Sequence, residues 1–403
     1  MCLCIWEPGG DRRLELDGAC PQVVVEGGIS ALPSIVVAAV HNQLGLDVTF
    51  VRVSGAREVE LECMDVEAVD FAGASWRAHA MSPTAEERVP WQRLGWLADT
   101  TAAVDGVLER IGRRRVGAAI QHRHSSVTGL VCYPTDRGEV WLKAVPPIFA
   151  HEASVVALVH EFAEATVPRV LAGAGEWWLS EGFVPVPGAP RGDFLTAHAA
   201  LQVASVQYAA DLRGAGCPER SMAALHRGVS ALASRGDLLD VRQRQDLREV
   251  ARHLGESLLP LDDVVPAALI HGDLNADNVG WGADGWFFFD WTDACVGHPF
   301  VDLALSLCVE APATRRARAK RYASVWADVI GTAASEAALA AWPLLGAAHH
   351  ALTYETICDE IDGSGSDHSN MEDMLAWLHY WVQALIAAVP QMGSSTALVR
   401  ASN

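Results

Sequence analysis

The segment His271–Asn278, together with Asp290, constrains this chain more than any other feature. It reads His-Gly-Asp, four further residues and Asn, and it is followed by an apolar strand that ends in Asp290. Phosphoryl transfer to a hydroxyl needs these groups in this order, with one carboxylate for the acceptor proton and an amide and a second carboxylate for Mg²⁺ on the ATP phosphates. We therefore predict that Asp273 takes or orients the proton and that Asn278 and Asp290 hold Mg²⁺. The alternative, a polar loop and a buried strand with two unrelated acids, leaves the Asp at the end of an aromatic run unexplained.

Lysine is rare in this chain, with Lys143 and Lys320 among 30 Lys and Arg residues. Because Arg serves almost everywhere else, a lysine is of interest where a compact ammonium group is required. Lys143 lies in the apolar run 140–145, which predicts a strand, and a kinase carries on such a strand the lysine that contacts the α- and β-phosphates. Lys320 lies in an Arg-rich run typical of a solvated helix face. Arg-rich codon usage also explains this composition, so the lysine pattern only supports the motif.

A β-hairpin is predicted around the turn residues 134–138, with strands at 125–133 and 139–143. In a kinase, the turn before this strand pair covers the ATP phosphates with backbone N–H groups. The expected turn spans 125–129 and does not have a Gly-x-Gly-x-x-Gly pattern. Its candidate nucleotide-binding residues are Ser126, Thr128 and Gly129.

The helix that follows is expected to supply one glutamate that pairs with the lysine and fixes its position. Glu152 lies in its first turns and is the candidate, and Glu161 is the alternative. Farther on, the strand beginning at Trp177 predicts a crossover between two lobes at Glu181, where the chain backbone would bond the adenine edge.

The first part of the chain predicts a small α/β unit. Its expected elements are a strand at 23–25, a helix at 34–44 and strands at 45–53 and 58–63. The helix, which ends in Gly-Leu, resembles the helix of a Nudix fold. The Nudix pattern needs several metal-binding glutamates, and the matching stretch 38–43 has none. We therefore expect a degenerate Nudix-like unit without hydrolase chemistry.

From about residue 193 the pattern is mainly helical and rich in Ala and Leu, and the catalytic loop interrupts it. Asp302, near the start of one such helix, is expected to cap the helix or to stabilise the loop. Near the end, residues 358–367 predict an acidic, Gly/Ser-rich loop. This loop is interpreted either as a plain solvated loop or as an acidic rim for a cationic substrate. The rim residues would be Asp359, Glu360 and Asp362.

Composition excludes several classes of function. The formal net charge of −20 argues against a nucleic-acid partner, and no apolar run approaches the ~18 residues of a membrane span. The first residues have neither a basic region nor a sustained apolar region, so a signal peptide is not predicted. The nine cysteines are scattered, Cys2 and Cys4 are the only close pair, and no second pair or His cluster completes a zinc site. Reduced thiols and a cytoplasmic location are expected.

With these residues in view, the chain resembles the aminoglycoside phosphotransferase family and its choline-kinase-like relatives from about residue 91 to 390. The residues that carry the resemblance are His271–Leu274, Asn278, Phe289–Trp291 and His298–Ala304, with Lys143 and Glu152 ahead of them. The resemblance implies an α+β, bilobal protein-kinase-like fold that binds ATP between a β-rich N-lobe and a helical C-lobe. It gives Asp273 the role of catalytic base and makes Asp290 the principal Mg²⁺ ligand. The extra N-terminal unit is a departure from the plain family fold.

Three domains are expected on this basis, at residues 1–85, 86–182 and 183–403. The predicted function is the transfer of the γ-phosphate of ATP to a hydroxyl of a small molecule, such as an antibiotic or a natural product. A metabolite kinase for a sugar, amino alcohol or nucleoside is the alternative, and an ATP-binding sensor without turnover is a further one. The sequence leaves the acceptor, the choice of ATP over GTP and the oligomeric state open.

Overall fold

The computed structural model describes residues 1–8, 10–25, 33–55, 58–67, 69, 73–78, 89–173, 175–186, 193–363 and 371–392. The chain divides into two compact units, which we call the sheet unit and the helical unit. The sheet unit comprises Met1–Ile148, Val170–Gly182 and Cys358–Glu372, and the helical unit comprises Phe149–Arg169, Phe183–Ile357 and Asp373–Asn403. Within the described ranges, none of the helices combines the length and the apolar character that a membrane crossing requires.

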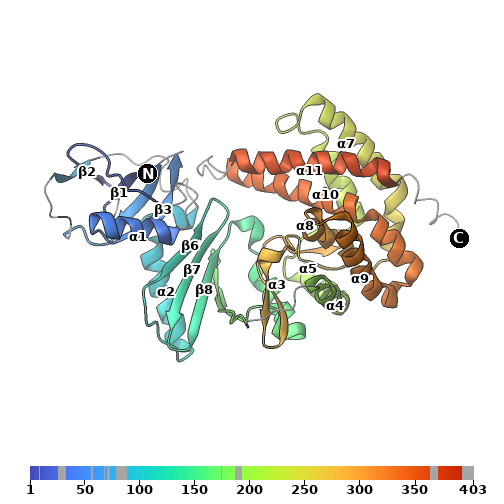
Figure 1. The fold of residues 1–403 in the computed structure, drawn as a ribbon, viewed down its shortest axis with the longest axis horizontal. Coiled ribbons are helices and arrows are strands. Elements are labelled where there is room, and N and C mark those ends of the chain that lie inside the picture. Colours follow the sequence, from blue (N-terminus) through green and yellow to red (C-terminus); the bar gives the residue numbers. More distant parts are fainter. Residues whose placement is uncertain are drawn as a thin grey trace. The chain divides into compact units, whose positions relative to one another are not determined.

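The sheet unit begins with a five-stranded mixed sheet in the order β3-β4-β1-β2-β5. Its elements are β1 (Cys2–Trp6), β2 (Arg12–Leu16), α1 (Pro33–Leu44), β3 (Val48–Gly55), β4 (Glu58–Cys63) and β5 (Ala74–Ala78). Strand β4 alternates Glu with apolar residues, so its apolar side chains share one face of the sheet, and Glu60 and Glu62 on the other face are buried as well. Val59, Leu61 and Cys63 join the core with Val36 and Val40 of α1, the helix that lies against the apolar face (Figure 1).

The strand predicted at 23–25 is wrong. Instead, Gln22 forms an isolated bridge to Cys2, and the backbone of Val23, which is buried in the core, exchanges hydrogen bonds with Met1 at 2.9 and 3.1 Å. Strand β2 pairs with β1 only at Trp6, so residues 21–23 lie beside the first residues of β1, and this pairing is too short to form a strand. The helix at 34–44 and the strand at 58–63 are confirmed, and strands β1 and β2 were not predicted.

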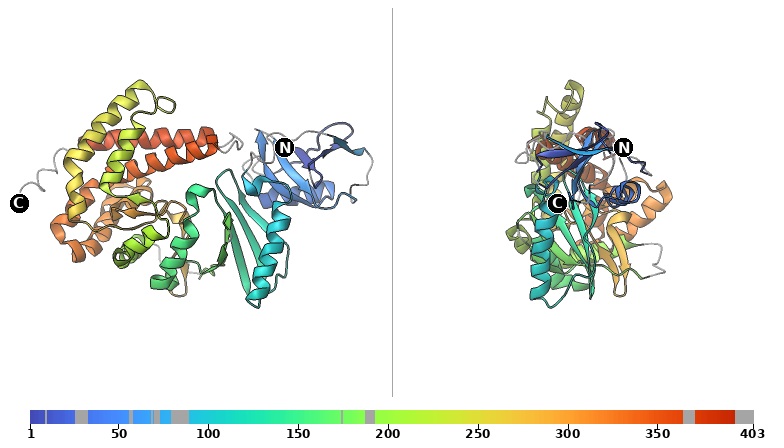
Figure 2. Two further views of the ribbon diagram at one scale, coloured as in Figure 1. Left: turned by 180° about the vertical axis from the view of Figure 1, so that it is seen from behind. Right: turned by 90° about the vertical axis from the view of Figure 1, so that its left-hand side faces the viewer.

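A second, antiparallel sheet follows in the order β6-β7-β8-β10-β9. Its elements are a 3-10 helix (Pro90–Gln92), α2 (Trp96–Arg110), β6 (Ile120–His124), β7 (Gly129–Thr135), β8 (Gly138–Ala144), β9 (Val170–Gly173) and β10 (Trp177–Glu181). Helix α2 runs along this sheet (Figure 2) and places Val104, Val107 and Leu108 in a core with the sheet residues Val131 and Leu142. The predicted hairpin is confirmed, with its turn between β7 and β8.

The two sheets touch within the sheet unit. The side chain of Gln121, on edge strand β6, donates to Phe50 O and accepts from Phe50 N of edge strand β3, both at 2.8 Å. Glu62 accepts from Gly95 N at 2.9 and 3.0 Å. Side chains thus satisfy backbone groups of an edge strand, at Phe50, and of the residue that precedes α2, Gly95. The expected boundary near residue 85 lies outside the described residues, and the division into three domains stays a prediction.

The helical unit packs its helices around two small sheets, β11-β15-β12 and β13-β14. Its shorter elements are α3 (Glu152–Ala163), α4 (Phe194–Ser205), α5 (Ala209–Gly214), β11 (Glu219–Arg220), α6 (Met222–Leu232), α7 (Val241–His253), β12 (Ala268–Ile270), β13 (Val279–Gly282), β14 (Gly285–Phe288), β15 (Cys295–Gly297) and α8 (Leu303–Cys308). Three long helices close the chain, α9 (Pro312–Ile330), α10 (Thr332–Gly363) and α11 (Met371–Met392). The predicted α+β class, with a β-rich and a helical part, is confirmed.

The acidic loop predicted at 358–367 is wrong over its first part, because α10 continues to Gly363. Ile357 and Ile361, one helical turn apart, are buried, whereas Asp359 and Asp362 are exposed, so the segment has the pattern of an amphipathic helix. Burial raises the pKa of Glu360. The remainder of the predicted loop, 364–367, lies outside the described residues.

Candidate active site

The catalytic loop follows strand β12, whose three residues are all buried. This strand pairs antiparallel with β15. The chain becomes polar at His271, makes a 3-10 turn at Ala276–Asn278 and enters β13. The loop is therefore held between a buried strand and a hairpin, both in the helical unit.

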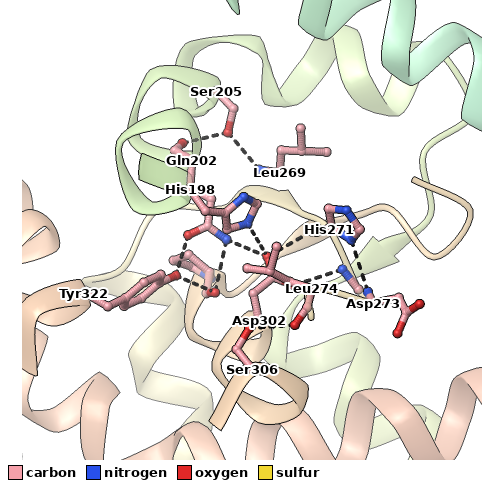
Figure 3. A network of polar contacts seen from close by, with 12 residues as sticks. His198, Gln202, Ser205, Leu269, His271, Asp273, Leu274, Asp302, Ser306 and Tyr322 are labelled. Carbon is pink, nitrogen blue, oxygen red and sulfur yellow. Dashed lines mark hydrogen bonds and ion pairs between the residues drawn. The ribbon is translucent and has the colours of Figure 1, made fainter. Parts of the chain in front are cut away.

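A buried carboxylate, Asp302, holds the start of this loop (Figure 3). Its oxygens accept from the backbone N–H groups of His271 and Gly272, both at 2.9 Å. His198 and Gln202 of α4 donate to the same carboxylate at 2.7 and 2.8 Å. Burial alone would raise the pKa of Asp302, but the hydrogen bonds from His198 and the loop, with the nearby imidazoles, outweigh it and lower the pKa. The expectation that Asp302 stabilises the loop is confirmed, and no side-chain cap on α8 is formed.

His271 orients the residues on both sides of the loop. Its ring is fully buried, Nε2–H donates to Phe289 O at 2.7 Å, and Nδ1 accepts from Asp273 N at 3.3 Å. Burial lowers the pKa of this imidazole to about 4, although the charge of Asp302 opposes the shift. The ring is therefore neutral near pH 7 and links the catalytic loop to the end of the aromatic strand.

The backbone conformation and the packing at position 272 require a glycine. Its φ is +83°, and a Cβ at this position would lie 2.2 Å from the backbone oxygen of Asp293. Any other residue combines a strained conformation with a steric clash. The sequence pattern contains this glycine for a packing reason that only the fold reveals.

The loop brings Asp273 and Asn278 into direct contact. Asn278 Nδ2 donates to the carboxylate and to the backbone oxygen of Asp273, both at 2.8 Å. Asn275 Nδ2 also lies 3.3 Å from the other carboxylate oxygen. Asn278 Nδ2 thus makes two hydrogen bonds to Asp273, and Asn278 Oδ1 is the atom of this side chain that would bind a cation.

Hairpin β13–β14 places Asp290 beside this pair. Phe289 N donates to Asn278 O at 2.9 Å, which makes Asp290 the next residue after a backbone contact with Asn278. Asp290 has φ +55°, in the left-handed region that non-glycine residues rarely adopt, and Thr292 Oγ1 donates to its carboxylate. One carboxylate and one amide oxygen on adjoining chain segments form a hard-oxygen donor set that fits Mg²⁺.

Lys143 lies in the sheet unit, on the central strand β8 and opposite Trp178 of β10. Its side chain is buried, with 8% exposure. Glu152 is the first residue of α3 and is 1% exposed. The two residues belong to different compact units, and their pairing stays a prediction.

The turn between β6 and β7 is closed by Ser125. Its Oγ accepts from Val127 N at 3.3 Å and from Thr128 N at 3.1 Å. Two backbone N–H groups expected to face phosphates are thus bound locally. Gly129 packs against Trp91, since a Cβ there would lie 2.9 Å from that ring, and Ser126 is buried. A nucleotide role for Ser126, Thr128 and Gly129 stays a prediction.

Glu181 ends β10 and forms an ion pair with Arg113. The next residue, Gly182, donates its N–H to Glu139 O at 2.8 Å, so the sheet pairing extends one residue beyond the strand. The segment that follows Glu181 passes into the helical unit, as the predicted crossover requires.

Sequence reasoning missed an aromatic group close to the catalytic loop. Burial, together with the negative charges of Asp273 and Asp293, raises the pKa of Tyr354 on α10, so its phenol lies within the electrostatic field of both carboxylates. Trp377 of α11 stacks on Tyr354 with ring centroids 6.1 Å apart and is 46% exposed. No sequence signal links these residues, because they lie on two separate helices.

A cavity of about 950 Å³ lies elsewhere in the helical unit, among α8, α9, α10 and α11. Its lining includes Arg315, Lys320, Trp342 and Trp381, and none of the predicted site residues. The presence of this cavity therefore does not identify the candidate active site. The carboxylates of the catalytic loop identify it.

The catalytic loop, the Asp after the aromatic strand and the lysine on a central strand define the class of small-molecule phosphotransferases with a protein-kinase-like fold. The model of the phosphotransferase enzyme family matches residues 135–340, about half of this 403-residue chain. The chain belongs to the phosphotransferase enzyme family.

Several solved structures are similar to this chain. One, from Thermobifida fusca and assigned as a fructosamine-3-kinase, is 21% identical, with 72% of this chain and 99% of that chain covered and a TM-score of 0.48. A type I macrolide 2'-phosphotransferase is 16% identical, with coverage of 71% and 97% and a TM-score of 0.48. Choline kinase from Cryptosporidium parvum is 12% identical, with coverage of 75% and 100% and a TM-score of 0.48. A search of curated proteins finds no match.

Proposed function

We propose that the protein transfers the γ-phosphate of ATP to a hydroxyl group of a small molecule. The observation that carries this proposal is the contact of Asn278 with the Asp273 carboxylate at 2.8 Å, on a loop whose backbone is anchored by buried Asp302. Catalysis of phosphoryl transfer consists mainly of positioning and charge stabilisation. An anchored loop that presents a carboxylate and an amide side by side supplies the positioning.

Asp273 acts as the base in this proposal. As the acceptor oxygen forms its bond to the γ-phosphorus, its proton moves to the Asp273 carboxylate, and the bond from the γ-phosphorus to the bridging oxygen breaks to release ADP. The hydrogen bonds from Asn278 fix the orientation of this carboxylate.

Asn278 and Asp290 would hold Mg²⁺, as the donor set described above fits. When bound, Mg²⁺ neutralises charge on the nucleotide phosphates. His271 supports this arrangement through two hydrogen bonds. Its ring bonds to the backbone of Phe289, the residue before Asp290, and to the backbone of Asp273. Its neutral ring fixes the separation between the base and the proposed metal ligands.

The sheet unit would bind the nucleotide. Lys143 is proposed to contact the α- and β-phosphates, with Glu152 as its partner and Glu161 as the alternative. Ser126, Thr128 and Gly129 would lie over the phosphates, and the backbone at Glu181 would bond the adenine edge. The single buried lysine on the central strand is the feature that supports this assignment most directly.

The acceptor is proposed to bind against Tyr354 and Trp377, beside Asp273 and Asp293. Exposed aromatic faces next to carboxylates favour a cationic or amphipathic molecule, through cation–π and Coulomb attraction. Names of the similar structures point to macrolides and choline as acceptors for those proteins. An antibiotic or natural product is the leading class for this chain, and an amino alcohol or other metabolite is the alternative.

An ATP-consumption screen tests the function. The purified chain is incubated with Mg-ATP and panels of aminoglycosides, macrolides, nucleosides and amino alcohols, and product mass is measured. We expect one panel member to gain one phosphate. Asp273→Asn should then lose about 10²–10⁴ in turnover, the usual contribution of a general base, while nucleotide binding measured by calorimetry is retained. ATP binding without turnover on any hydroxyl compound would instead favour the sensor.

The acidic end of α10 offers a second test of the acceptor class. Asp359, Glu360 and Asp362 are proposed to attract a cationic acceptor. Neutralising all three should raise KM and reduce its dependence on salt, with little change in kcat, because such attraction is screened over ~8 Å at physiological ionic strength. Neutralising three exposed acids on other helices, Glu249, Glu256 and Asp328, is the matched control. An unchanged KM in the first variant would leave these residues as plain surface acids.

A further inference from the structure

One face of the N-terminal sheet gathers sulfur atoms. Cys2 and Cys4 alternate along β1 with Leu3 and Ile5, which belong to the apolar core under α1. Because side chains alternate along a strand, both cysteines lie on the face opposite α1. Two thiols two residues apart on one strand face do not make a binding site by themselves. Whether this face can bind a ligand depends on the groups that the neighbouring strands place beside them.

The topology adds a carboxylate and a third thiol. Strands β1 and β4 run parallel with Cys2 opposite Glu58, and Cys20 lies one residue beyond the bridge that joins Ala19 to Leu16 at the end of β2. The Sγ atoms of Cys2 and Cys20 and a carboxylate oxygen of Glu58 all lie within 4.8 Å of one another. Cys4 Sγ lies 2.7 Å from Glu58 Oε1.

Arg13 completes the surroundings of this cluster. Its Nη1 donates to Cys4 Sγ at 3.7 Å, and its side chain is 17% exposed. Three thiolates and one carboxylate around a divalent cation carry a net charge of −2. A guanidinium beside a sulfur reduces that excess, and a guanidinium N–H is a suitable donor to a metal-bound thiolate.

A soft divalent cation binds thiols in their thiolate form. Binding at this cluster would therefore release the thiol protons to solvent.

We propose that Cys2, Cys20, Glu58 and Cys4 form a zinc-binding site in the N-terminal sheet. Three thiolates and one carboxylate are a donor set that zinc accepts in tetrahedral geometry, and thiolates favour zinc over Mg²⁺ or Ca²⁺. The donor atoms of Cys2, Cys20 and Glu58 already lie within 4.8 Å of one another, and Cys4, which contacts Glu58, would complete the tetrahedron by a larger side-chain movement towards Zn–S distances of about 2.3 Å. The ion would add side-chain cross-links between β1, the segment after β2 and the start of β4, which the structure already joins through backbone hydrogen bonds.

The test uses the full chain without a metal-binding tag, reduced and stripped with a chelator. Zinc is titrated in competition with a chromophoric chelator, and cobalt is titrated separately, because its visible spectrum reports tetrahedral thiolate coordination. We expect one zinc per chain and a cobalt–thiolate spectrum. Thermal unfolding should shift upward with zinc, since a ligand that binds only the folded state stabilises it.

Cys20→Ser and Glu58→Gln should each weaken zinc binding by more than about 10-fold, since loss even of an outer-shell partner typically costs 10–100-fold. Cys63→Ser is the matched control, because Cys63 lies on β4 but in the core on the opposite face. It should bind zinc like the unchanged chain. Circular dichroism of the metal-free variants separates lost binding from lost folding.

Three results would overturn the proposal. One is a hydrated-cobalt spectrum with no zinc retained. A second is equal loss of zinc binding in the Cys63→Ser control. The third is a mass lower by two hydrogens in the non-reduced chain, with Cys2 and Cys20 joined in one peptide that persists in the presence of zinc, because a disulfide then explains the cluster.

Discussion

The catalytic loop and the turn between β6 and β7 were both predicted to meet the nucleotide, yet they are built in different ways. In the catalytic loop, the backbone N–H groups of His271 and Gly272 are held by Asp302, about 30 residues further along the chain. In the β6–β7 turn, Val127 and Thr128 are held by Ser125, two and three residues away. The first anchor is long-range and buried, and the second is local and partly buried.

This difference shows how each region can act. Asp302 holds the start of the loop from within the core, so this anchor does not use the side chains of Asp273 and Asn278. Ser125 instead binds two N–H groups that would have faced phosphates. We infer that the sheet unit contributes to catalysis mainly through the Lys143 side chain, and less through the backbone of its turn.

Among the changes that test this comparison between the two regions, Lys143→Arg should have the largest effect. A guanidinium is larger and planar, and it does not fit a buried slot shaped for one ammonium. We expect kcat/KM to fall by about 10²–10³, the usual result of removing one charge-stabilising donor. Lys320→Arg is the matched control, since Lys320 is exposed on α9, and it should keep normal turnover. Ordinary activity in Lys143→Arg would mean that the turn backbone, and not the lysine, carries the phosphates.

Gly272→Ala breaks the long-range anchor of the catalytic loop. The left-handed φ costs about 1–2 kcal/mol for a residue with a Cβ, and the clash with Asp293 O adds the cost of overpacking, about 1–3 kcal/mol. Gly95→Ala is the control, with a left-handed φ of +77° and no atom within 4 Å of the added Cβ. Urea unfolding should show a loss of about 2–5 kcal/mol at position 272 and about 1–2 kcal/mol at position 95. Equal losses would show that the loop moves freely away from Asp293.

Acid should weaken the same anchor. The folded-state pKa of His271 is about 4, below the ordinary value of 6.5, so the unfolded chain binds more protons between these values. Stability from this group is therefore complete above pH 6.5 and is lost as the pH falls towards 4, by at most about 1.4 kcal/mol per pH unit. Asp302, with a lowered pKa, adds a loss only below its ordinary value of 3.8.

Urea unfolding at pH 7, 6 and 5 measures this slope, and kcat measured at the same pH values provides the contrast. The free energy of unfolding should fall while His271 stays neutral in the folded protein, so the loop itself should remain intact. His124 in the sheet unit, whose pKa burial also lowers to about 4, contributes in the same window. A flat stability profile from pH 7 to 5 would contradict burial of neutral imidazoles in both regions.

The prediction from sequence succeeded where the signal is local. The alternation in β4, the hairpin of β7 and β8 and the helix α1 follow from periodicity and turn residues within a few positions of one another. It failed at 23–25 and at 358–363. An apolar run does not reveal how far its pairing with a neighbouring strand extends, and acidic residues do not end a helix whose other face is buried.

By itself, the sequence determined the family, the order of the catalytic loop and the rare lysine on a strand, because these depend on residue type at short spacing. Only the tertiary structure decided that Asp302 anchors the loop with His198 and Gln202, that Tyr354 lies near Asp273, and that Cys20 and Glu58 join Cys2. These contacts join segments that can be more than 100 residues apart, such as His198 and Asp302. Local propensity carries no information about such pairs, because the path of the whole chain and the burial of its apolar faces bring them together.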